Sequence, residues 1–197
     1  TQDNTKESYI HYIKLLESLN TPIYTIPGNH DNKTIMRSVL KKPLFHYCDE
    51  LVIHNWLIIG IDSSKEHSPS GNISQRELQR LKSSIKSTNA EYIMIYLHHQ
   101  PININSRWID VIGLENKNEL YEILNNNKKI RALFFGHIHQ SVEMHYGDIQ
   151  VIGTPSTCRQ FKPNSNSFAM DNSPPGYREI QLNQNGSIDT NVVWLNQ

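Results

Sequence analysis

The chain has 197 residues, of which 37% are hydrophobic and 19% charged, a composition typical of one soluble globular domain with a sizeable core. Lys plus Arg equal Asp plus Glu at 19 each, so the overall charge favours neither nucleic acid nor an anionic membrane as a partner. The two cysteines, Cys48 and Cys158, do not make a disulfide framework, and no apolar run reaches the roughly 18 residues that cross a bilayer. We therefore expect a cytoplasmic protein.

Hydrophobic periodicity predicts helices that alternate with strands. In chain order the predicted elements are a helix at 5–19, a strand at 23–26, a short helix at 34–41, two strands within 51–61, a helix at 74–85, a strand at 92–97, a helix at 116–124 and a strand at 130–135. Turn residues at 147–148 and 185–186 predict antiparallel strands in the remainder. These elements predict a single α/β layered domain over residues 1–197, with two packed sheets and helices outside.

Two helices have clear side-chain signatures. The first is predicted to bury one face formed by Tyr9, Ile13, Leu16 and Leu19. The helix at 74–85 begins with the spacing of a capping box, Ser74-x-x-Glu77, and carries an apolar stripe of Leu78, Leu81 and Ile85.

Histidine-bearing loops follow three of the predicted strands. Gly28-Asn-His-Asp31 follows the strand 23–26, His98-His-Gln-Pro101 follows the strand 92–97, and Gly136-His-Ile-His139 follows the strand 130–135. Binding sites in open α/β sheets form at the carboxyl ends of strands. We therefore expect the three loops to meet at one point, although they are far apart in sequence.

The side chains of these loops include several metal ligands. His137 and His139 are separated by one residue, so an extended turn would direct them toward two neighbouring metals. His98 adds a third imidazole, and Asn29 supplies an amide oxygen that suits a divalent ion.

His30 and Asp31 suggest acid–base chemistry in the first loop. A carboxylate close to an imidazole fixes its tautomer and raises its pKa, which favours a general acid. Each loop alone also has a simpler interpretation, because Gly, Asn and Asp are usual turn residues and a single loop histidine commonly lies at the surface. Three such loops at strand ends favour the metal-site interpretation.

The motifs resemble the last three blocks of the calcineurin-like metallophosphoesterases, and the likeness extends over nearly the whole chain. Within that superfamily the chain is most similar to bacterial class III cyclic-AMP phosphodiesterases. The stretches that carry this resemblance are Pro27–Asp31, Leu97–Pro101, Gly136–Gln140, Thr154–Pro163 and Ser173–Arg178.

The resemblance implies a fold, a metal centre and a substrate. The implied fold is a four-layer sandwich of two mixed β-sheets flanked by helices. One metal would be bound by Asn29, His98 and His137, and His139 would bind the other. Asn29, His30 and His139 would contact the substrate phosphate, with His30 protonating the leaving oxygen and Asp31 orienting His30. The implied cofactors are two divalent ions (Fe, Mn, Zn or Mg), and the implied reaction is hydrolysis of cyclic AMP to AMP.

The sequence departs from the family in one respect. The family has two earlier blocks, Asp-x-His and Gly-Asp, which supply further ligands and the carboxylate that bridges both metals. Neither block occurs here, and Gly147-Asp148 lies after the last block, in a predicted hairpin turn. The expectation is a domain without its amino-terminal βα segment, and a chain that by itself is metal-poor or inactive.

Two alternative functions remain open at this stage. The site also suits another phosphate ester, because metals recognise the phosphate alone, and the same fold can serve as a non-catalytic binding module. Three further residues have two interpretations each. His99 is expected either to hydrogen-bond a ligand or to have a structural role, and Phe161 and Tyr177 are expected to pack, with stacking on a nucleobase as the alternative.

Overall fold

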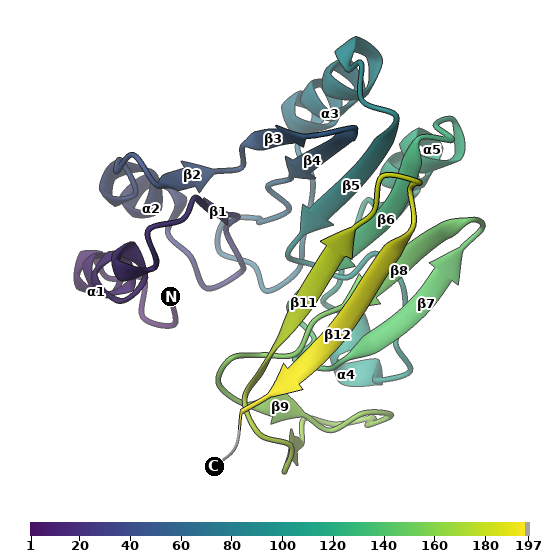
Figure 1. Cartoon of the computed structure of the whole chain (residues 1–197). Coiled ribbons are helices and arrows are strands. Elements are labelled where there is room, and N and C mark those ends of the chain that lie inside the picture. Colours follow the sequence, from purple (N-terminus) through teal and green to yellow (C-terminus); the bar gives the residue numbers. More distant parts are fainter. Residues whose placement is uncertain (196–197) are drawn as a thin grey trace.

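A six-stranded mixed sheet forms the centre of the computed structural model, which describes residues 1–195 (Figure 1). Across the sheet the strands are β3 (Glu50–Ile53), β4 (Trp56–Gly60), β5 (Tyr92–Leu97), β6 (Ile130–Phe135), β8 (Ile149–Gly153) and β7 (Val142–Tyr146). The four central strands are parallel, and β3 and β7 pair antiparallel at the two edges. The central strands are apolar runs because both faces of this part of the sheet are covered.

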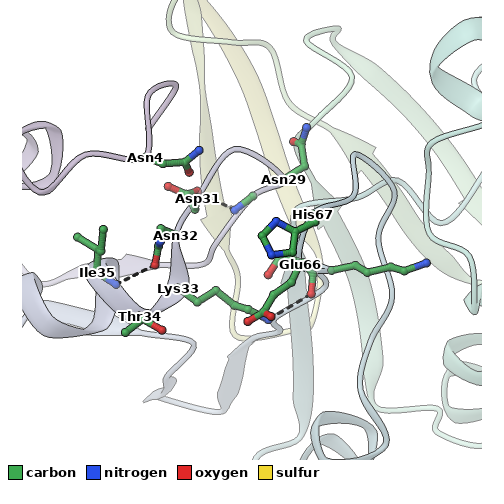
Figure 2. Close-up of a pocket in the computed structure, with 12 residues that line it drawn as sticks. Asn4, Asn29, Asp31, Asn32, Lys33, Thr34, Ile35, Glu66 and His67 are labelled. Atoms are coloured by element: carbon green, nitrogen blue, oxygen red, sulfur yellow. Dashed lines mark hydrogen bonds between the residues drawn. The ribbon is translucent and has the colours of Figure 1, made fainter.

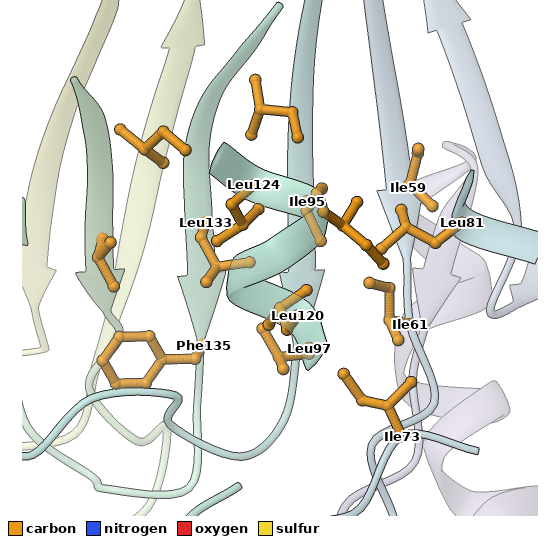
Figure 3. Packing of buried hydrophobic residues seen from close by; sticks show 14 of the residues in the cluster. Ile59, Ile61, Ile73, Leu81, Ile95, Leu97, Leu120, Leu124, Leu133 and Phe135 are labelled. Atoms are coloured by element: carbon orange, nitrogen blue, oxygen red, sulfur yellow. The ribbon is translucent and has the colours of Figure 1, made fainter. Parts of the chain in front are cut away.

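Helices cover one face of this sheet. They are α3 (Gln75–Ser87), the short α4 (Arg107–Asp110) and α5 (Lys117–Asn125). Figure 3 shows Leu81, Leu120 and Leu124 from these helices packed against Ile95 and Leu133 of the strands. The predicted stripe of α3 is buried, and its predicted amino-terminal cap is present because the Ser74 hydroxyl accepts the Glu77 amide.

An antiparallel hairpin covers the opposite face. It consists of β11 (Gly176–Leu182) and β12 (Ile188–Trp194), drawn in yellow in front of the sheet in Figure 1. A second core lies between the two layers and contains Trp56, Met94, Ala132, Phe134, Ile152 and Ile188. The indole of Trp56 also donates to the Asn183 carbonyl at 2.8 Å, which joins the sheet to the hairpin.

The first 47 residues form a separate group beside the sheet (Figure 1). It contains α1 (Lys6–Leu16), the 3₁₀ helix η1 (Glu17–Leu19), β1 (Ile23–Thr25), α2 (Lys33–Val39) and β2 (Phe45–Tyr47), with β1 and β2 paired in parallel. Tyr9 and Ile13 are buried as predicted, but Leu19 is 60% exposed. The prediction for Leu19 is wrong because the helix tightens to 3₁₀ geometry and ends at Asn20 with φ of 48°, which rotates Leu19 away from the core.

The expected class, mixed sheets flanked by helices, agrees with this architecture. Within residues 1–195 the second layer is a two-stranded hairpin, and two further pairs are β1–β2 and β9 (Gln160–Phe161) with β10 (Met170–Asp171). The sequence did not predict β2, α4, β9 or β10, which are all four residues long or shorter. No helix among these residues is long and apolar enough to cross a membrane.

Candidate metal centre

The three histidine-bearing loops follow strands β1, β5 and β6. Strands β5 and β6 are adjacent and parallel, with Leu97 opposite Phe135, so the loops that follow them start side by side. The amide of Gly136 donates to the His98 carbonyl at 3.1 Å, which holds these two loops together beyond the sheet. The register of β5 and β6 therefore places their loops side by side, whereas the loop after β1, a strand of a separate sheet, reaches them through the contact of Asn29 with His98.

Three potential ligand atoms converge there. The Nε2 atom of His98 lies 3.0 Å from Oδ1 of Asn29 and 3.2 Å from Nδ1 of His137. One amide oxygen and two imidazole nitrogens form a suitable donor set for a borderline divalent cation. The structure thus brings together the three side chains that the sequence assigns to one metal, and their donor atoms fit such an ion.

His137 occupies a strained turn. Its φ is 65°, and the Ile138 amide donates to the Gly136 carbonyl at 2.7 Å, which closes a γ-turn of the rare positive-φ type. His139 also has a positive φ of 49°. The turn is therefore not extended, and the argument that an extended turn would direct the two histidines toward two metals does not apply. Ile138, which is fully buried, anchors the turn in the core and leaves the histidines on either side at the site.

A glycine allows the first loop to approach His98. A Cβ atom on Gly28 would lie 2.8 Å from Cε1 of His98 and 3.0 Å from both ring nitrogens. Real side chains do not tolerate such distances, so only glycine lets the Asn29 loop come this close to the imidazole. Gly136 lies on another side of the same ring and is less constrained, because its Cβ would be 3.5 Å from Nδ1.

Burial keeps the clustered imidazoles neutral. Burial, followed by repulsion from His99 and His139, lowers the pKa of His137 to about 3. The pKa of His98 is also well below its usual value, first through burial and then through its histidine neighbours. Both rings are therefore unprotonated at neutral pH, with lone pairs available to a metal ion.

His99 forms a wall of the site. It is fully buried, its Nδ1 lies 2.9 Å from the Ser63 hydroxyl, and its ring centroid lies 4.8 Å from that of His137. Its potential ligand atom lies within 4.8 Å of those of His98 and His137. Sequence reasoning did not single out Ser63, because a serine in a loop carries no distinguishing signal.

His139 is fixed by two contacts. Its Nδ1 donates to the Arg159 carbonyl at 2.8 Å, and its ring stacks on Phe161 with centroids 4.2 Å apart and planes 3° from parallel. The bond at Nδ1 leaves Nε2 as the atom with a free lone pair. The charge of His139, when protonated, also lowers the pKa of His98 and His137, which is consistent with a position beside them.

The side chains of His30 and Asp31 contact different residues. His30 is exposed, with Nδ1 3.4 Å from Nε2 of Gln2. The Asp31 carboxylate accepts the Tyr9 hydroxyl at 2.8 Å and the Gly28 amide at 2.8 Å. Among residues 1–195 no hydrogen bond joins Asp31 to His30. Asp31 therefore shapes the loop that carries Asn29, and its predicted orienting role toward His30 has no direct contact behind it.

A cleft of about 440 Å³ opens beside Asn29. It lies between the segment from Asp31 to the start of α2 at Lys33 and the loop that contains Glu66 and His67, and Figure 2 shows these side chains beside it. Lys33 reaches the Ser64 carbonyl at 3.4 Å and so spans the floor of the cleft.

Comparisons with known proteins identify the family of this chain. The calcineurin-like phosphoesterase family profile matches residues 3–141. The 3′,5′-cyclic adenosine monophosphate phosphodiesterase CpdA of Haemophilus influenzae is 36% identical, and the match covers all of this chain and 72% of that protein. The CpdA protein of Escherichia coli K12 is 31% identical, and the match covers 97% of this chain and 70% of that protein. A dimetal phosphatase from Danio rerio has a similar fold, with a TM-score of 0.60 and 14% sequence identity. The structural match covers 89% of this chain and 73% of the phosphatase chain. The chain belongs to the calcineurin-like phosphoesterase family.

Proposed function

We propose that this protein is a metal-dependent phosphodiesterase that hydrolyses cyclic AMP to AMP. The observation that carries the proposal is the convergence of Asn29 and His137 on His98, each with a donor atom within hydrogen-bonding distance of Nε2 of His98. The choice of cyclic AMP is supported by the relatives named as cyclic-AMP phosphodiesterases and by the similarity that continues through residues 154–163.

The proposed ligands divide into two groups. Asn29, His98 and His137 would hold one divalent ion (Fe, Mn, Zn or Mg), and His139 would contribute Nε2 to a second. When bound, such ions polarise the phosphoryl oxygens and offset the negative charge that develops during displacement. These four donors are neutral, so the carboxylates that the family resemblance implies in the two earlier blocks would be needed to offset the charge of the ions.

His30 is proposed as the general acid. It is exposed, so its ring can reach a bound phosphate and exchange its proton with solvent. In the reaction the oxygen of water adds to phosphorus and releases one proton to solvent, the bond to the sugar oxygen breaks, and the sugar oxygen takes a proton from His30, which regains it from solvent. Asn29 and His139 would contact the same phosphate from the opposite loops, and Asp31 would keep the His30 loop in place through the Gly28 amide.

Three further elements of the proposal concern context. Residues 1–197 would form one metallophosphoesterase domain that lacks an amino-terminal βα segment, the protein would act in the cytoplasm, and its partner would be a small phosphodiester rather than nucleic acid or a membrane. The chain spans 72% of the Haemophilus relative. Experiments on activity should therefore use the full-length gene product.

Turnover of cyclic AMP with Mn²⁺ tests the proposal. We expect EDTA to abolish turnover, added Mn²⁺ to restore it, and Asn29→Ala or His137→Ala to lower kcat/KM at least about 100-fold, because losing even a residue that only hydrogen-bonds a metal ligand costs about 10–100-fold. The matched control is His145→Ala, an exposed histidine on β7 that should retain wild-type activity. Intact turnover in Asn29→Ala would contradict the ligand assignment.

The choice of substrate needs a separate comparison. Rates on cyclic AMP, an aryl phosphodiester and an aryl phosphomonoester, measured on one preparation, distinguish a cyclic-nucleotide phosphodiesterase from a phosphoesterase for another substrate. Metal binding without turnover of any of the three would favour a non-catalytic binding module.

A further inference from the structure

Three aromatic rings form a cluster beside the candidate metal centre. The Phe161 ring lies 5.0 Å from Trp108 and 5.5 Å from Phe168, and Trp108 lies 5.2 Å from Phe168, all in edge-to-face arrangements. Trp108 comes from α4, whereas Phe161 and Phe168 flank the connection between β9 and β10. Edge-to-face contacts fix the orientation of each ring, so the cluster is a preformed surface.

Phe168 is the exposed member of this cluster. It is 60% exposed, whereas Trp108 and Phe161 are half-buried. A phenyl ring that is held by two aromatic neighbours and remains this open presents apolar surface to solvent at a fixed angle. Such a ring stacks on a planar ligand at little entropic cost, because its rotamer is already restricted.

The cluster is continuous with the metal centre. One face of Phe161 is stacked on His139, and the Phe161 amide donates to the His139 carbonyl at 3.1 Å. Two ring contacts therefore lead from a proposed metal and phosphate ligand, His139, through Phe161 to the open ring of Phe168. A ligand with a phosphate at one end and an aromatic base at the other fits this sequence of contacts.

We propose that Phe168 stacks on the purine base of the nucleotide substrate and so determines its specificity; this inference rests on the proposed function. The phosphate would lie at His139 and the base on the open side of the Phe161–Phe168 pair. Stacking on a single ring makes no hydrogen bonds to the base edge, so it distinguishes ring size rather than base identity. The cluster therefore favours purine over pyrimidine cyclic nucleotides.

Substitutions at Phe168 separate stacking from general apolar contact. Phe168→Tyr keeps the ring face, whereas Phe168→Leu keeps apolar bulk and loses the π-system. In the full-length protein we expect Phe168→Leu to raise KM for cyclic AMP about 10-fold, within the 5- to 150-fold range that loss of one stacked base corresponds to, with kcat little changed. Phe168→Tyr should keep the wild-type KM.

A substrate without a base provides the matched control. The 3,5-cyclic phosphate of 1-deoxyribose has the same sugar and phosphate but no base, and its KM should be equal in wild type and in Phe168→Leu. A readout independent of turnover is the binding of AMP by calorimetry, which should weaken in Phe168→Leu by the same factor as KM rises.

The outcomes distinguish the two proposals. Wild-type turnover of cyclic AMP together with an unchanged KM in Phe168→Leu would overturn the assignment of Phe168 and leave the proposed function standing. An equal rise in KM for the base-free analogue would also overturn it, because the ring would then act on the phosphate site. Failure of the wild-type protein to hydrolyse cyclic AMP would refute the proposed function and the base assignment with it.

Discussion

Replacing Gly28 with alanine tests whether close packing against His98 creates the metal site. The added Cβ would lie 2.8 Å from Cε1 of His98, whereas ordinary contact begins at 3.4 Å, so ring and loop must separate by 0.6 Å. Metal–ligand distances vary by only about 0.2 Å. Because Asn29 and His98 are held on opposite sides of this contact, the donor atoms can no longer reach one ion at their proper distances.

The expected loss is larger for metal binding than for folding. Affinity for Mn²⁺ should fall about 10- to 100-fold, the usual cost of disturbing groups that orient ligands. The free energy of unfolding should fall by about 1–3 kcal/mol, as for other overpacked sites. Calorimetric titration with Mn²⁺ and urea unfolding of the metal-free protein measure the two quantities separately.

Gly136 supplies the matched control on the same imidazole. Its Cβ would lie 3.5 Å from Nδ1 of His98, an ordinary contact, and its φ, like that of Gly28, is not positive. Gly136→Ala should therefore bind Mn²⁺ with nearly wild-type affinity. If Gly28→Ala also binds Mn²⁺ as the wild type does, the close approach of the loop does not create the site and the reasoning fails.

Two further predictions concern stability. Burial lowers the pKa of His99 to about 4 from its usual 6.5, so the unfolded state binds this proton first as the pH falls. The metal-free protein should therefore lose stability between pH 6.5 and 4, by up to about 1.4 kcal/mol per pH unit from this residue. The measurement is the urea midpoint as a function of pH, and an equally steep pH dependence in His99→Asn would contradict the prediction. The Arg178 side chain is 1% exposed and donates to Glu143, among other acceptors, so Arg178→Ala should cost about 1.5–3 kcal/mol in urea unfolding. Lys65→Ala, which breaks an ion pair with Glu115 that is about half exposed, should cost less than about 1 kcal/mol, and equal losses in the two variants would refute the distinction.

The sequence predicted the central strands well because their signal is local and strong. The runs at 92–97 and 130–135 coincide with β5 and β6, since a strand buried on both faces is continuously apolar. The meeting of His98 and His137 could also be predicted, because the parallel strands β5 and β6 end at one edge of a sheet. Asn29 was expected there by the same rule, but β1 belongs to a separate sheet, and Asn29 reaches His98 because Gly28 packs closely on that imidazole. The short strands β2, β9 and β10 were not predicted, whereas the equally short β1 was, because Pro22 and Pro27 bound its β-rich run.

The local geometry of the site was less predictable than its composition. The capping box at Ser74 is only half formed, because the Glu77 carboxylate binds elsewhere. It accepts the amide of Asp62, which is distant in sequence, and it also binds Arg80. The stack of Phe161 on His139 likewise joins two segments whose sequences give no sign of the contact. Long-range contacts decide such details, and a single sequence does not contain them.

Several features of the site lower the stability of the metal-free fold. His137 has a positive φ, a conformation that costs on the order of 1–3 kcal/mol for a residue other than glycine. At acid pH the lowered pKa values of His98 and His137 add a second cost, because the unfolded state binds protons that the folded state does not. The core provides the compensation, because Ile138 between the two histidines is fully buried and fixes the turn. A hydrophobic residue at the centre of the Gly136–His139 motif thus holds the two proposed ligands in place through its burial in the core, and the strained turn would then serve to preorganise them.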